Sequence, residues 1–66
     1  MKKNKKIAKL MLKETGLKLR EVSIQPENLL YVSIYHDICA LANLKQYKLV
    51  IGMCKCFNEH LDRLAD

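Results

Sequence analysis

The chain has 66 residues, of which 50% are hydrophobic, and it carries a formal net charge of +5. A chain of this length forms one domain with a small core, because it buries only about 60% of the surface that its unfolded form exposes. The length therefore excludes a multidomain enzyme, and the surplus of apolar residues favours burial between copies, most simply in a homodimer.

The three cysteines are an odd number and do not form a recognisable disulfide framework. Lys9 and Lys13 interrupt the apolar residues that follow the lysine-rich start, and no small-residue cleavage site comes after them, which is unlike a secretory signal. No apolar run approaches the roughly 20 residues of a transmembrane helix. These features predict a cytoplasmic protein with reduced thiols and no transmembrane segment.

Charge is distributed unevenly along the chain. Residues 1–20 hold eight Lys or Arg and one Glu, a balance of +7, whereas residues 21–66 hold four Lys or Arg and six Asp or Glu, a balance of −2. This asymmetry is typical of a basic segment that contacts nucleic acid, an acidic protein surface or anionic lipid. The residues predicted to contact nucleic acid or an acidic partner are Lys2, Lys3, Lys5, Lys6, Lys9, Lys13, Lys18 and Arg20.

The N-terminal third has the pattern of a basic amphipathic helix. Good helix formers dominate over Lys5–Thr15, and Gly16 stands where a left-handed C-terminal cap would end the helix. Helical spacing places Ile7 and Leu10 on one side and the lysines on another. The lysine face matches a phosphate-contacting surface, but a merely solvated face or a helix at a membrane surface has the same pattern.

The segment from Pro26 to Leu64 predicts two antiparallel helices. Pro26 suits the first position of a helix that runs to about Ala42, and Asn43 is placed to end it and to cap the next, with Gln46 in the capping-box position. Apolar residues recur at spacings of three and four in both helices, and seams this short must bury each other or a partner. The seam residues are Tyr31, Ile34, Ile38 and Leu41, followed by Tyr47, Val50, Cys54, Phe57, Leu61 and Leu64.

The predicted fold is a single all-α domain with a basic N-terminal helix at 1–16 and an antiparallel helical hairpin at 26–65. Two segments keep a small α+β fold open as an alternative. Leu17–Gln25 alternates apolar and polar residues and permits a short strand or one further helical turn. Lys48–Met53 contains β-compatible residues and also Gly52, which either permits the close approach of another helix or marks a strand.

Histidines and cysteines suggest a metal site by composition but not by geometry. Zinc takes such ligands in tetrahedral sets, and the candidates are His36, Cys39, Cys54, Cys56 and His60. Two residues apart on a helix means about 200° around its axis, so Cys54 and Cys56 face opposite sides. An exposed pair such as Cys56 and His60 has no pocket and no oxyanion donors around it. We predict no metal, no cofactor and no catalytic residues.

The predicted function is that of a small, non-enzymatic regulatory protein that docks on a protein partner. Tyrosines and aliphatic residues at helical spacing suit an interface as well as a core, and the basic helix would steer the chain to an acidic surface. The predicted interface residues are Leu30, Tyr31, Ile34, Tyr35 and Ile38. The alternative is a dimeric nucleic-acid-binding regulator that contacts phosphates through the basic N-terminal residues.

Overall fold

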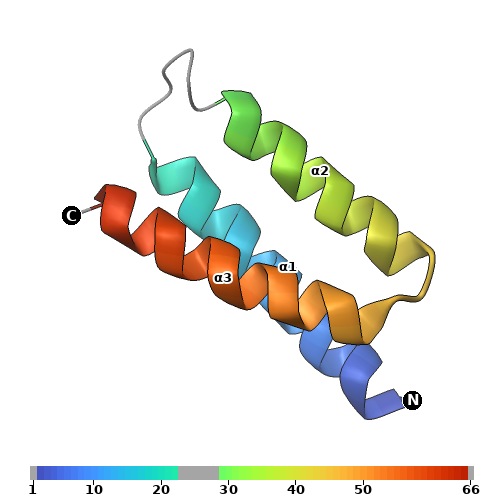
Figure 1. Cartoon of the computed structure of the whole chain (residues 1–66). Helices are drawn as coiled ribbons and strands as arrows, with labels where there is room; N and C mark the ends of the chain where they lie inside the picture. Colours follow the sequence, from blue (N-terminus) through green and yellow to red (C-terminus); the bar gives the residue numbers. More distant parts are fainter. Residues whose placement is uncertain (1, 23–28, 66) are drawn as a thin grey trace.

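The chain folds into three helices that lie side by side. A computed structural model describes the backbone of residues 2–22 and 29–65 and the side chains of residues 3–22 and 29–64. Helix α1 spans Lys2–Glu21, α2 spans Leu29–Asn43 and α3 spans Tyr47–Ala65. α1 and α3 run in the same direction, and α2 runs in the opposite one (Figure 1). The all-α prediction is confirmed.

The segments that kept an α+β fold open are helical where the structure describes them. Lys48–Met53 lies within α3, and residues 17–21 form the last turn of α1. Residues 23–25, and the helix start predicted at Pro26, lie outside the described residues. Over 2–22 and 29–65 the chain contains no strand, so the α+β alternative is wrong there. The heptad spacing through Gly52 decides the conformation, because core packing outweighs the roughly 1 kcal/mol cost of a glycine in a helix.

Helix α1 is longer than predicted, and the predicted cap at Gly16 is wrong. The helix spans Lys2–Glu21 and so continues five residues beyond the predicted end at 16, and neither glycine of the chain has a positive φ. It continues past Gly16 because Leu19 and Val22 pack against the core. Those contacts stabilise the last turn more than Gly16 destabilises it.

Gly16 instead admits the side chain of Tyr35 from α2. A Cβ atom added at Gly16 would lie 3.0 Å from the Tyr35 hydroxyl oxygen, so a larger residue would displace it. That hydroxyl donates a hydrogen bond of 3.3 Å to the Leu12 carbonyl. Burial raises the pKa of Tyr35 above its ordinary value, which keeps the hydroxyl protonated and able to donate. The contact attaches α2 to α1.

A Schellman motif ends α2 at Asn43, close to the predicted position. The Gln46 amide donates to the Leu41 carbonyl and the Lys45 amide donates to the Ala42 carbonyl, both at 3.0 Å. Lys45 adopts the left-handed conformation that this motif requires, with φ at 63°. The chain therefore reverses direction between α2 and α3 through backbone hydrogen bonds.

Gln46 rather than Asn43 is the N-cap of α3. The Val50 amide donates to the Gln46 carbonyl at 3.0 Å, which makes Gln46 the residue whose carbonyl accepts the first bond of the helix. The predicted cap at Asn43 is wrong because the Schellman motif keeps Asn43 in the last turn of α2 and delays the start of α3.

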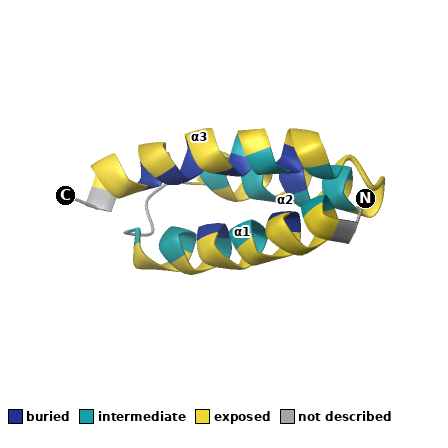
Figure 2. Cartoon of the chain, turned by 90° about the horizontal axis from the view of Figure 1, so that it is seen from below, coloured by how far each residue is buried: buried dark blue, intermediate teal, exposed yellow. Residues whose placement is uncertain are grey.

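The apolar seam predicted on α3 forms most of the core. We call Val50, Cys54, Phe57 and Leu61 the inner seam; all four are buried, whereas Leu64 beyond them is 44% exposed. Figure 2 shows buried residues of α3 on the side that faces α1. The fully buried partners of the inner seam from the other two helices are Ala8, Thr15 and Ile38.

A buried polar contact joins α1 to α3. The Thr15 hydroxyl oxygen lies 2.8 Å from the Met11 carbonyl and 2.6 Å from the side-chain amide of Asn58. A hydroxyl has one proton, so it cannot donate to two acceptors. Its proton is donated to the Oδ1 atom of Asn58, the closer of the two acceptors, which joins the two helices directly. This contact fixes the register of α1 along α3.

Candidate functional site

An apolar groove runs between α2 and α3, and its volume is about 680 Å³. In a bundle of three helices, a groove between two of them lies on the side away from the third, here α1. We call it the α2/α3 groove. Its lining residues are Tyr31, Ile34, Ile38, Lys48, Leu49, Gly52, Met53, Cys56, Phe57 and His60.

Aromatic side chains form the wall of the groove. The ring centroids of Tyr31 and Phe57 are 6.2 Å apart, and those of Tyr31 and His60 are 5.2 Å apart. The His60 Nε2 atom also lies within 3.1 Å of the Tyr31 hydroxyl. These contacts between α2 and α3 hold the aromatic rings in defined orientations, so the groove side chains would lose little conformational entropy if a ligand bound there.

The middle of the groove is open at Gly52. A Cβ atom added there would have no neighbouring atom within 4 Å, and Leu49 one turn earlier is 51% exposed. The close approach of another helix that Gly52 was predicted to permit is therefore not made by α1 or α2. A surface that is concave, apolar and open along a helix suits an apolar helix from outside this chain.

The predicted interface residues divide between three environments. Tyr31, Ile34 and Ile38 line the groove together, and Ile38 is fully buried at its base. Leu30 is 64% exposed and is not among the lining residues. Tyr35 points toward α1, where its hydroxyl meets the Leu12 carbonyl, and it is not among the lining residues.

Sequence reasoning missed the contribution of α3 to this groove. Leu49, Met53, Cys56 and His60 recur at spacings of four, three and four, next to the inner seam. We call these four residues the outer seam. The same periodicity that identified the inner seam was thus present twice on α3, and the second occurrence is the signal that would have located the groove.

The predicted cationic residues follow the outer face of α1. Lys6, Lys9 and Lys13 recur at spacings of three and four residues, which places them on one face of the helix. Arg20 lies on the same face, two turns after Lys13. We call these four residues the basic face. Lys2 belongs to α1, but its side chain lies outside the described ones. The exposed cations of α1 are Lys3, Lys5, Lys6, Lys9, Lys13 and Arg20.

Lys18 differs from the other predicted cations because it is paired. Its Nζ atom lies 2.5 Å from Asp62 of α3 and 3.9 Å from Glu14. The hydrogen bond to Asp62 raises the pKa of Lys18 above its ordinary value. Among the described side chains Lys18 is the one cation with an ion pair, so the charge of the basic face is uncompensated.

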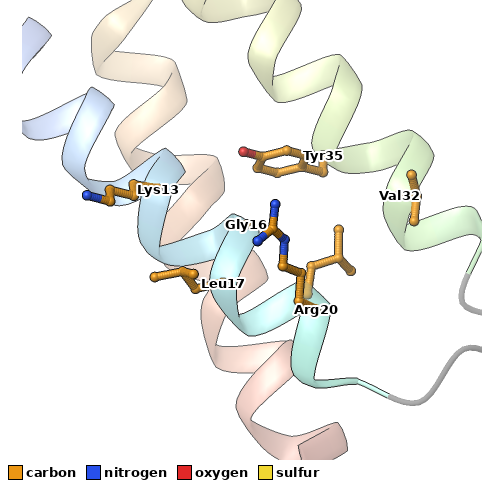
Figure 3. A pocket seen from close by; sticks show the side chains of 7 residues that line it. Lys13, Gly16, Leu17, Arg20, Val32 and Tyr35 are labelled. Atoms are coloured by element: carbon orange, nitrogen blue, oxygen red, sulfur yellow. The ribbon is translucent and has the colours of Figure 1, made fainter.

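A second crevice of about 610 Å³ lies between α1 and α2, beside the basic face. Figure 3 shows Arg20 extending toward the Tyr35 ring, whereas Lys13 extends to the other side. Leu17, Leu19 and Val32 supply apolar walls.

The histidines and cysteines considered as metal ligands do not converge. Cys54 is buried in the inner seam, where burial raises the pKa of its thiol, and Cys56 is exposed on the α2/α3 groove. Over the part of the chain that the structure describes, no three His, Cys, Asp or Glu side chains gather as a metal site would require. The exposed thiol of Cys56 is therefore a chemical reporter of the groove.

Comparison with known protein families, with curated proteins and with solved structures finds no match for this chain. Within the described residues, none of the three helices combines the length and the apolar character needed to span a bilayer.

Proposed function

We propose that the chain is a small, non-enzymatic interaction protein that docks on a protein partner through the α2/α3 groove. The observation that carries this proposal is the groove itself: an apolar surface, with aromatic walls, that none of the three described helices covers. Grooves of this kind accept the apolar face of an amphipathic helix, whose residues at i, i+3 or i+4 and i+7 enter in turn. The regulatory role and the cytoplasmic location remain predictions.

Charge supports an acidic partner. The groove has Lys48 and His60 among its lining residues and no carboxylate, and the chain as a whole carries +5. The uncompensated basic face adds a long-range attraction that raises the rate of encounter with an acidic protein. We therefore propose an acidic amphipathic helix as the element that the groove recognises.

A peptide titration tests this proposal. The probe is a synthetic amphipathic helix with leucines on one face and glutamates on the other, and the control is a peptide of the same composition in scrambled order. We expect the first peptide alone to shift the amide NMR signals of Leu49, Met53 and Phe57. Leu49→Glu is expected to abolish the shifts, whereas the matched change Ala40→Glu, at an exposed position of α2 outside the groove, is expected to retain them. Equal binding of both peptides would contradict the proposal.

A second candidate function is binding to the phosphate backbone of nucleic acid, and the basic face favours it. Lysines aligned on one helix face, with no carboxylate paired to them, give affinity without base readout and a steep dependence on salt. A dimer would present two such faces, and the second contact would benefit from the effective concentration that the first creates.

Fluorescence anisotropy with a labelled random duplex, at low and at near-physiological salt, separates this candidate from the first. Lys6→Glu, Lys9→Glu and Lys13→Glu together are expected to abolish binding. The charge-matched control changes Lys45, Lys48 and Lys55 to Glu; all three are exposed and none lies on α1, so binding is expected to persist. An equal loss in both triple variants would show that net charge alone, and not the basic face, drives the binding.

A further inference from the structure

Two exposed leucines lie among the lysines on the outer side of α1. Leu10 is 62% exposed and Leu17 is 53% exposed, and we call them the leucine pair. Seven residues are nearly two full turns of a helix, so both side chains leave α1 on the same side. Leu10 lies between Lys6 and Lys13, and Leu17 follows Lys13 by one turn. Figure 3 shows Lys13 and Leu17 extending to the same side of α1, so this side is apolar and basic at once.

The carboxylates of α1 do not neutralise the cations beside the leucine pair. The helix has two carboxylates, Glu14 and Glu21, and helical spacing places them on the flank of the leucine pair away from the basic face. Glu14 lies 3.9 Å from the Nζ atom of Lys18, which also pairs with Asp62. Among the described side chains, the lysines around the leucine pair are exposed and have no ion pair: Lys3, Lys6, Lys9 and Lys13.

The leucine pair contributes to neither the core nor the α2/α3 groove. The apolar residues of α1 that form the core or pack against it are Ala8, Met11, Leu12, Leu19 and Val22. Neither Leu10 nor Leu17 is among them, and neither lines the groove. A lysine face that only contacts water has no use for two large apolar side chains within it. The leucine pair therefore suits a contact outside this chain.

A surface that carries both cations and leucines matches the interface of an anionic bilayer. Negatively charged headgroups attract Lys and Arg, and the acyl chains directly below them accept apolar side chains. The long stem of a lysine is itself apolar, so lysines beside an inserted leucine still reach the headgroups with their charged ends. Leu10 and Leu17 are about 10 Å apart along the axis of α1, so a helix parallel to the bilayer inserts both.

Nucleic acid would use only part of this surface. Phosphate groups pair with the lysines but make no favourable contact with a leucine. The bases of a single strand stack on aromatic rings, and α1 contains none. An acidic protein would need a concave surface to cover the convex side of one helix, whereas lipids rearrange around it. The combination of residues therefore favours a bilayer.

Other exposed leucines lack this combination. Leu29 and Leu30, at the start of α2, are 65% and 64% exposed, but α2 contains neither Lys nor Arg. They are as apolar and as exposed as the leucine pair, without a basic face beside them on their helix. These two leucines are therefore a matched control for the leucine pair.

From these observations we infer that the outer side of α1 binds the surface of an anionic membrane. The leucine pair inserts at the boundary between headgroups and acyl chains, and the lysines of the basic face lie at the level of the lipid phosphates. The inference goes beyond the proposed function, because none of these residues lines the α2/α3 groove. A chain bound in this way would bring the partner of its groove to the membrane.

Sedimentation with vesicles tests the inference. Vesicles of equal parts phosphatidylserine and phosphatidylcholine are compared with vesicles of phosphatidylcholine alone, and we expect the chain to bind only the first. Leu10→Gln combined with Leu17→Gln retains helix propensity and should weaken binding at least about tenfold. Leu29→Gln combined with Leu30→Gln should bind like wild type. Circular dichroism checks that both double variants are folded.

Three results would overturn the inference. The first is no binding to the anionic vesicles at low salt. The second is equal binding by wild type and the variant of the leucine pair, because charge alone would then hold the chain. The third is an equal loss in the two double variants, because any exposed leucine would then serve. A chain that binds a random duplex but not the anionic vesicles gives the first result and favours nucleic acid.

The peptide titration separates the inference from the proposed function. The variant of the leucine pair is expected to bind the acidic amphipathic peptide like wild type, since its groove is unchanged. A chain that binds the peptide but no vesicles overturns the inference and leaves the proposed function standing. A chain that binds the anionic vesicles through the leucine pair but not the peptide supports the inference and contradicts the proposed function.

Discussion

The two sides of α3 carry apolar residues at the same spacing, yet only one side is closed by this chain. The inner seam is covered by α1 and α2, and Thr15 and Asn58 fix the position of α1 along it. The outer seam has α2 on one flank and solvent on the other, and Leu49 within it is 51% exposed. In the described part of the chain, the three helices enclose one face of α3 and leave the other partly open.

The difference shows how a small chain divides its apolar residues between stability and association. Residues on the inner side contribute to folding by themselves, because their burial is complete in one chain. Residues on the outer side contribute fully only when a partner covers them. The two sides are therefore expected to respond differently to mutation and, if a partner covers the outer seam, to protein concentration.

The largest expected effect is the difference in stability between the variants Leu61→Ala and Leu49→Ala. Leu61→Ala removes a side chain that is 1% exposed and leaves a cavity, so it should lower the free energy of unfolding by about 2–5 kcal/mol. That is a large part of the roughly 3–10 kcal/mol expected for a chain of this size. Leu49→Ala should cost less than about 1 kcal/mol at low protein concentration. Urea denaturation followed by circular dichroism measures both.

Repeating these measurements at several protein concentrations tests this first comparison further. If a second copy covers the outer seam, the cost of Leu49→Ala rises with protein concentration. The cost of Leu61→Ala stays closer to its low-concentration value, since its cavity is present in the single chain. Equal costs for the two leucines at low concentration would show that the two sides of α3 do not differ.

The second prediction concerns the buried contact that only the inner side has. Thr15→Val keeps the shape of the side chain but leaves the buried amide of Asn58 without its partner, and should cost about 1–3 kcal/mol. Thr15→Val combined with Asn58→Leu should recover much of that loss, because both polar groups are then removed together. Urea denaturation of the two single variants and the double variant gives the coupling energy. Additive costs would show that the contact contributes little.

The third prediction compares the two glycines. Gly52→Ala, on the outer side, should stabilise the single chain by about 1 kcal/mol through helix propensity, since nothing lies near the added Cβ. Gly16→Ala gains the same propensity but displaces the Tyr35 hydroxyl from its bond to Leu12, so we expect no gain. Thermal unfolding measures both. In a Tyr35→Phe background, where the obstructing oxygen is absent, Gly16→Ala should become stabilising.

Periodicity predicted most of this fold and only half of the candidate site. It placed Val50, Cys54, Phe57 and Leu61 in the core because a spacing of three and four defines one helix face regardless of what covers it. It did not show that Leu49 and Met53 belong to a second face. Two adjacent seams on one helix overlap in sequence, and the arrangement of three helices decides which of them is covered.

The errors at element ends have a common physical cause. Gly16 and Asn43 are favourable caps by local preference, yet α1 passes the first and a backbone motif displaces the cap role of the second. Local preferences of about 1 kcal/mol are smaller than the packing of a whole turn, so contacts distant in sequence decide where these helices begin and end. The ion pair between Lys18 and Asp62 could not be predicted from the sequence for the same reason, because the two residues are 44 positions apart.

The smallest expected effect is that of this ion pair at the edge of the inner side. The hydrogen bond to Asp62 raises the pKa of Lys18 above its ordinary value of 10.5 in the folded chain. A group whose pKa is raised by folding stabilises the fold fully below its ordinary pKa, and the contribution is lost as the pH rises through the folded pKa. Asp62→Asn should therefore be slightly less stable than wild type from neutral pH to about pH 10, and the difference should shrink above that.

Urea denaturation of wild type and Asp62→Asn across this pH range measures the difference, which salt should reduce because the pair is partly exposed. Tyr35 and Cys54 also have raised pKa values and also lower the stability of the fold at alkaline pH. They are present in both proteins, so their effect cancels in the comparison. A difference that persists unchanged above the pKa of Lys18 would show that Asp62 acts through packing on α1 and not through the charge of Lys18.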